Sequence, residues 1–140
     1  MTILKFQYSD CAMAHQLLKE ALKARTNAIS PLSGFSVGCA LEIDDGTIVY
    51  GANVESGIPV LSSCAERSAI ISALSQGFRK FKRIAVIADY PRPTPPCGAC
   101  RQFILEFAPD AEIITGNLKG DVKHYENITE LMPNAYHFIK

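Results

Sequence analysis

The sequence has no excess of charge of either sign. Its 140 residues include fourteen lysine and arginine residues and fourteen aspartate and glutamate residues. A balanced chain lacks the electrostatic field that draws a protein to nucleic acid or to an anionic membrane. We therefore expect neither partner, and a small neutral ligand fits the composition better.

Long apolar runs are also missing. No stretch approaches the roughly 18 residues that a membrane-spanning helix needs, and residues 1–15 lack the apolar core of a signal peptide. We therefore expect a cytoplasmic protein. With 48% hydrophobic and 20% charged residues, and with no internal repeat or low-complexity segment, the chain is expected to form a single domain over residues 1–140.

Histidine is scarce, and the number of cysteines is odd. The three histidines, His15, His124 and His137, are isolated in the sequence. Five cysteines in a chain expected to meet reducing conditions favour a metal or catalytic role over a disulfide framework. Cys11 and Cys39 have no second cysteine or histidine nearby, and each isolated histidine is more typical of a surface or hydrogen-bonded residue than of a metal ligand.

Apolar periodicity predicts an α/β fold. Apolar residues alternate with small or polar ones over 35–43, which indicates a half-buried strand, and an Asp-Gly turn leads into an antiparallel partner over 47–53. A continuous apolar run over 83–89 is typical of a central strand covered on both faces. The other expected strands are 111–115 and 121–126, and the expected helices are 9–25, 64–76, 97–108 and 127–133. This order predicts a three-layer α/β/α sandwich with a mixed five-stranded sheet.

Three of the cysteines lie at expected helix starts. Cys97 and Cys100 form a C-x-x-C pair, and Cys64 begins another helix. Helix starts favour thiolate over thiol, and three thiolates suit zinc. Because no fourth ligand is evident, we expect the open coordination position of a catalytic site. Glu66, two residues after Cys64, could then hold the proton that an activated water gives up.

The motifs Cys-Ala-Glu-Arg (64–67) and Pro-Cys-Gly-Ala-Cys-Arg-Gln (96–102) resemble those of the zinc-dependent nucleoside and nucleobase deaminases. Within that superfamily, the chain is similar to cytidine deaminases of the small homotetrameric type over nearly its whole length. The resemblance implies a hydrolase that converts cytidine and 2′-deoxycytidine to uridine and 2′-deoxyuridine in pyrimidine salvage, with release of ammonia.

The resemblance also implies a role for individual residues. Cys64, Cys97 and Cys100 match the ligands of one Zn²⁺ per chain, and Glu66 matches the proton shuttle. Arg67 matches an arginine that hydrogen-bonds a ligand thiolate, which offsets the excess negative charge of three thiolates.

Substrate contacts follow from the same resemblance. Asn53 and Glu55 match a pair that holds the ribose hydroxyls, Phe35 matches an aromatic lying against the pyrimidine, and Ala65 is assigned to the substrate site. Tyr136 falls near a C-terminal aromatic that reaches a neighbouring subunit's pocket. Simpler structural explanations also fit: Asn53 and Glu55 could end a strand in a turn, Phe35 could be a core residue, and Arg67 could form an ion pair at a helix start.

The chain departs from the family pattern at three positions. Pro59 stands where the family has Tyr, Leu32 replaces the Tyr of an Ala-Pro-Tyr-Ser segment, and Pro95 stands where Ser is common. These departures bear on substrate range and, at Pro59, on contacts between subunits.

Three alternatives remain open at this stage. A deaminase for a cytosine-containing antibiotic of the blasticidin S type shares the zinc motifs. A nucleic-acid-editing or nucleic-acid-binding module would have to use the basic cluster 79–83. A structural zinc site would need a fourth ligand, and a C-x-x-C redox protein would leave Cys64 and Glu66 without a role.

Overall fold

The computed structural model describes residues 8–138, with side chains from residue 16 onward. Cys11 and His15, considered above as isolated residues, therefore lie outside the described side chains. The elements in chain order are α1 (Tyr8–Arg25), β1 (Val37–Ile43), β2 (Ile48–Ala52), the 3₁₀ helix η1 (Pro59–Leu61), α2 (Ala65–Ser75), β3 (Phe81–Ala88), α3 (Gly98–Phe107), β4 (Glu112–Asn117), β5 (Val122–Tyr125) and the 3₁₀ helix η2 (Ile128–Leu131).

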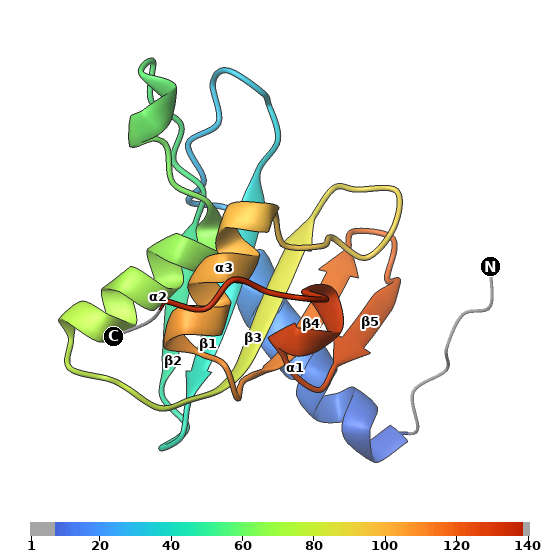
Figure 1. Cartoon of the computed structure of the whole chain (residues 1–140). Helices are drawn as coiled ribbons and strands as arrows, with labels where there is room; N and C mark the ends of the chain where they lie inside the picture. Colours follow the sequence, from blue (N-terminus) through green and yellow to red (C-terminus); the bar gives the residue numbers. More distant parts are fainter. Residues whose placement is uncertain (1–7, 139–140) are drawn as a thin grey trace.

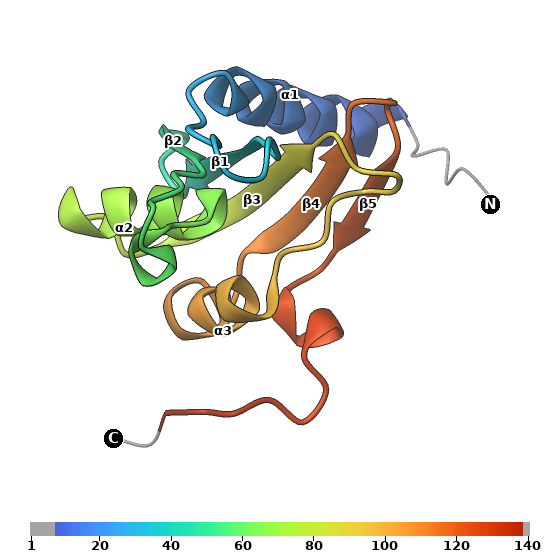
Figure 2. The same ribbon diagram turned by 90° about the horizontal axis from the view of Figure 1, so that it is seen from above.

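The five strands form one sheet in the order β2-β1-β3-β4-β5. The β3–β4 pair is parallel, and the other three pairs are antiparallel. Helix α1 covers one face, whereas α2 and α3 cover the other (Figures 1 and 2). The predicted three-layer α/β/α arrangement with a mixed five-stranded sheet is confirmed.

The prediction that β1 is half-buried was wrong. Every residue of β1 except Glu42 is buried, so both faces of the strand are covered. The residues that alternate with its large apolar side chains include Gly38 and Ala40, which are small rather than polar, and α1 packs directly on them. A Cβ added to Gly38 would lie 2.0 Å from the backbone oxygen of Ala21 in α1, so this close approach requires glycine.

A second close approach sets the position of α2. A Cβ added to Gly51 in β2 would lie 2.2 Å from the backbone oxygen of Ala65 and 2.6 Å from the backbone nitrogen of Ala69. The first turn of α2 therefore rests directly on the backbone of β2. This contact places the start of α2 at the same end of the sheet as the start of α3 (Figure 1).

The core on the α2/α3 side combines the apolar faces of β1 and β3 with those of the two helices. A smaller core lies between α1 and the other face of the sheet. No helix in the described part of the chain is long and apolar enough to cross a membrane.

Candidate metal and catalytic site

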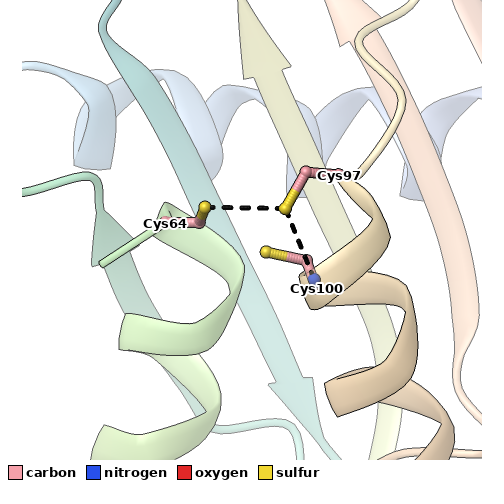
Figure 3. Close-up of side chains that lie close together, drawn as sticks. All are labelled: Cys64, Cys97 and Cys100. Carbon is pink, nitrogen blue, oxygen red and sulfur yellow. Dashed lines mark hydrogen bonds between the residues drawn. The ribbon is translucent and has the colours of Figure 1, made fainter. Parts of the chain in front are cut away.

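Three cysteine sulfurs meet where α2 and α3 begin. Cys64 is the N-cap residue of α2, and Cys97 is the N-cap residue of α3. Cys100 lies in the first turn of α3, and its thiol points into the space between the two helices (Figure 3). The three sulfurs lie within 4.8 Å of one another. The cysteines that the sequence motifs single out are thus brought together.

The spacing of the sulfurs suits a zinc ion. Zn–S bonds of about 2.3 Å in a tetrahedral site place the sulfurs roughly 3.8 Å apart. The Sγ atoms of Cys64 and Cys97 are separated by 3.7 Å. Among the described side chains no histidine, aspartate or glutamate joins the group, and the backbone N–H of Cys100 donates to Cys97 Sγ at 3.4 Å, which steadies that thiolate.

Charge around the sulfurs favours ionisation at Cys64. The pKa of its thiol is lowered to about 5 because the neighbouring Cys100 thiol shares its proton with it and because Arg67 lies beside it. The Arg67 Nη2 atom donates to Cys64 Sγ at 3.3 Å. The pKa of the Cys100 thiol is raised by its interaction with the Cys64 sulfur and by its complete burial. Arg67 therefore hydrogen-bonds one of the sulfurs that the resemblance assigns to zinc.

Glu66 lies in the first turn of α2, beside this group. Its side chain is buried, with 4% of the residue exposed, and its Oε2 accepts a hydrogen bond from the Cys100 thiol at 3.4 Å. Burial raises the pKa of the Glu66 carboxyl, and the negative charge of Cys64 raises it further. Such a carboxyl binds and releases a proton closer to neutral pH than an exposed glutamate does.

A cavity of about 160 Å³ opens beside the sulfurs. Its walls include the predicted residues Phe35, Asn53, Ala65 and Glu66. The volume is below the roughly 300 to 1,000 Å³ of pockets that enclose drug-sized ligands. It suits a single heterocyclic ring better than a complete nucleoside, so a sugar would extend toward the mouth.

Sequence reasoning missed two residues of the cavity wall, Val37 and Thr94. Val37 follows Phe35 with period two, so its side chain shares the same face of the extended chain, and this signal was available. Thr94 is 5% exposed, and both its backbone N–H and its hydroxyl donate to the backbone oxygen of Gly116, at 3.1 and 2.8 Å. The only sequence signal for Thr94 as a cavity residue was its position in the proline-rich loop that precedes Cys97.

Asn53 and Glu55 both hold the loop that carries Phe35. Asn53 Nδ2 donates to the backbone oxygen of Phe35 at 2.7 Å, and its Oδ1 accepts from the backbone N–H of Val37 at 2.8 Å. Glu55 Oε1 accepts from the backbone N–H groups of Leu32 and Ser33 at 3.0 and 3.1 Å. Hydrogen bonds from Ser33, followed by that from Leu32, lower the pKa of the Glu55 carboxyl. The turn explanation therefore accounts for the Oε1 atom of Glu55, which accepts both backbone N–H groups.

Tyr136 is not brought to the cavity of its own chain. It is 69% exposed, in a C-terminal segment that runs past the outer side of α3 (Figure 2). The Gln102 side chain of α3 donates to the Tyr136 backbone oxygen at 3.1 Å. Tyr136 therefore lies on the exposed surface, outside the cavity of its own chain.

Together, the fold and the site define an α/β protein with a three-cysteine zinc site that is open on one side and faces a small cavity. Residues 12–116 match the family model described as the cytidine and deoxycytidylate deaminase zinc-binding region. The chain belongs to this zinc-binding deaminase family.

Individual relatives agree with the family match. The chain is 47% identical over 121 residues to a cytidine deaminase of Halalkalibacterium halodurans, covering 86% of this chain and 91% of the relative. It is 44% identical over 122 residues to one from Sporosarcina psychrophila, covering 86% and 89%. The crystal structure of cytidine deaminase from Burkholderia pseudomallei superposes with a TM-score of 0.84 at 42% identity, covering 87% of this chain and 98% of that one.

Proposed function

We propose that the protein is a zinc-dependent hydrolase that deaminates cytidine and 2′-deoxycytidine to uridine and 2′-deoxyuridine. The observation that carries this proposal is the buried Glu66 carboxyl at the floor of a ring-sized cavity, 3.4 Å from the thiol of a metal-site cysteine. The names of the relatives support the same substrate.

Cys64, Cys97 and Cys100 would hold the zinc ion. When bound, zinc lowers the pKa of a coordinated water and so supplies a nucleophile at neutral pH. Arg67 keeps the Cys64 sulfur ionised and draws charge away from it, which makes the three-thiolate site less electron-rich.

Glu66 is the proton carrier in this proposal. Its carboxylate takes a proton from the attacking water and delivers it to N3 of the pyrimidine. It then takes the proton of the new hydroxyl on C4 and gives it to the amine, so that the C4–N bond breaks, ammonia leaves and C4 becomes a carbonyl. The raised pKa of the Glu66 carboxyl suits both steps, because the group must accept and release a proton at the same pH.

The remaining residues orient the nucleoside. Phe35 and Ala65 line the cavity for the base, and the Pro95 carbonyl is an acceptor for the exocyclic amine. The second oxygen of Glu55 and the remaining N–H of Asn53 are the groups offered to ribose hydroxyls. A sugar-binding role for these two favours a nucleoside over an antibiotic of the blasticidin S type.

The proposed function also includes an oligomeric state and a cellular location. We place the protein in the cytoplasm, in pyrimidine salvage, as a single domain that forms a homotetramer with Tyr136 reaching a neighbouring site. The shallow cavity supports assembly, because one chain covers a base but leaves a sugar exposed. The large exposed apolar side chains of η1 support it too.

The direct test is to incubate zinc-loaded protein with cytidine, 2′-deoxycytidine and blasticidin S in parallel. Loss of the amino-pyrimidine absorbance and release of ammonia are followed together. We expect rapid turnover of both nucleosides and little of the antibiotic. Protein that carries one zinc per chain and leaves both nucleosides unchanged would contradict the proposal.

A further inference from the structure

An aromatic pair lies just beyond the ends of β1 and β3. The antiparallel register of the two strands ends at the pair of Val37 and Ala88, and Phe35 and Tyr90 each lie two residues beyond it. Their rings meet edge to face, with centroids 6.2 Å apart and planes inclined by 67°. This is a favourable geometry for two aromatic rings.

Phe35 belongs to the cavity wall, whereas Tyr90 lies behind it as the neighbouring ring. The contact therefore connects the cavity with the proline-rich loop between β3 and α3. Opposed side chains of this kind stabilise each other's positions across antiparallel strands.

Tyr90 is itself held from two further sides. The Asn117 side chain donates from Nδ2 to the Tyr90 backbone oxygen at 3.1 Å, and Asn117 is buried at the end of β4. The guanidinium carbon of Arg92 lies over the Tyr90 ring, 5.7 Å from its centroid. Within the described part of the chain the phenol oxygen makes no hydrogen bond, so the ring rather than the hydroxyl makes the useful contact.

We propose that Tyr90 is a positioning residue that keeps the Phe35 ring in the orientation that receives the pyrimidine. Without the neighbouring ring, Phe35 samples other rotamers, and only a fraction of molecules presents a complete cavity wall. The apparent affinity falls to that fraction of its intrinsic value, whereas the chemical step on bound substrate is unchanged. This inference rests on the proposed deamination, and it adds a residue outside the cavity that tunes KM rather than kcat.

The experiment compares wild-type protein with Tyr90→Leu and Tyr90→Phe, each loaded with one zinc per chain. The kcat and KM for cytidine are measured together with the dissociation constant of uridine by calorimetry. For Tyr90→Leu we expect KM and the uridine dissociation constant to rise roughly two- to tenfold, the range that an aromatic pair allows. Tyr90→Phe keeps the ring and should retain wild-type values.

Tyr125→Leu serves as the matched control. Tyr125 also lies under a cation, with Lys123 Nζ 5.0 Å from its ring centroid, but it is on β5 and does not line the cavity. Its loss should lower thermal stability without raising KM. The inference would be overturned if Tyr90→Leu left KM and the uridine affinity unchanged. It would also be overturned if Tyr90→Phe raised both constants as much as Tyr90→Leu does.

The uridine measurement separates this inference from the proposed function. Wild-type protein that binds uridine but does not release ammonia would contradict deamination, and the Tyr90 variants would then be judged on uridine affinity alone. Wild-type protein that neither binds uridine nor turns over cytidine would contradict both.

Discussion

The Sγ atoms of Cys64 and Cys97 lie 3.7 Å apart, although the two residues are separated by 33 positions in the sequence. Each caps a different helix, and the two helices start at the same end of the sheet (Figure 3). The spacing is therefore a product of how α2 and α3 pack on the strands. Neither cysteine motif alone could provide it.

Replacing Cys64 by Ser should remove the zinc ion. The variant loses one of three sulfur ligands, so we expect zinc affinity to fall by at least about 100-fold, because changes to partners of the ligands alone cost 10- to 100-fold. Metal content after dialysis and competition with a chromogenic chelator measure this. Cys39→Ala is the control, since Cys39 is fully buried in β1 and is not part of the sulfur group. Retention of wild-type zinc affinity by Cys64→Ser would rule out the assigned ligand.

Glu66→Gln should separate metal binding from turnover. Glutamine keeps the size of the side chain but cannot carry the proton, so we expect normal zinc content and a kcat lower by roughly 10²- to 10⁴-fold. Steady-state assays with cytidine and metal analysis give both quantities. Glu106→Gln, at an exposed position on the same helix layer, should behave as wild type. Appreciable turnover by Glu66→Gln would assign the proton transfer to another group.

Glu55→Gln should weaken binding through the sugar. Hydrogen bonds to a charged group contribute about 1.5–3 kcal/mol, which corresponds to roughly 10- to 100-fold in KM for cytidine. The effect should shrink for 2′,3′-dideoxycytidine, which lacks the 2′- and 3′-hydroxyls. A loss of equal size with both substrates would instead mean that Glu55 acts only by holding the loop at Leu32 and Ser33.

A control for that experiment lies elsewhere in the chain. Glu130 also uses its carboxylate to accept a backbone N–H, from Glu126 at 2.6 Å, but it lies in η2 and does not line the cavity. Glu130→Gln should leave KM unchanged for both substrates. A rise in KM for this variant would show that loosening a loop elsewhere in the chain is enough to weaken cytidine binding, without any lost contact to the sugar.

Val60→Asp should disrupt the proposed homotetramer. Val60 is 86% exposed at the centre of η1, a short helix with no buried residue, and a carboxylate there would oppose burial against another chain. Size-exclusion chromatography with light scattering should give four chains for the wild type and fewer for the variant. A wild-type monomer would contradict the proposed assembly and leave Tyr136 without a neighbouring cavity.

The grouping of the three cysteines could be predicted because the pattern that singles them out is local. Cysteines spaced C-x-x-C at a helix start, and a third cysteine followed by Glu66, require only helix geometry to be recognised. The strands and the three α-helices were likewise predictable from apolar periodicity, although β1 begins at Val37 rather than Phe35 and the expected helix 127–133 is the 3₁₀ helix η2 (Ile128–Leu131). The 3₁₀ helix η1 was not predicted.

Other features depend on contacts between distant segments. The burial of both faces of β1 follows from α1 packing on Gly38, and periodicity alone cannot tell a small residue under a helix from a small residue facing water. The bonds of Asn53 to the backbone near Phe35 arise across 16 to 18 positions of sequence. The contact of Tyr90 with Phe35 needs the register of β1 and β3, which no local pattern specifies.

Gly51 carries no donor atom, yet it helps determine whether this protein can bind a metal. The first turn of α2 rests on its backbone, with a clearance too small for a methyl group. Any side chain there would lift the helix start, and with it Cys64 and Glu66, away from the two cysteines of α3. Metal–ligand distances tolerate only about ±0.2 Å. An Ala at this position in β2 would therefore weaken zinc binding, although the residue lies outside the metal site.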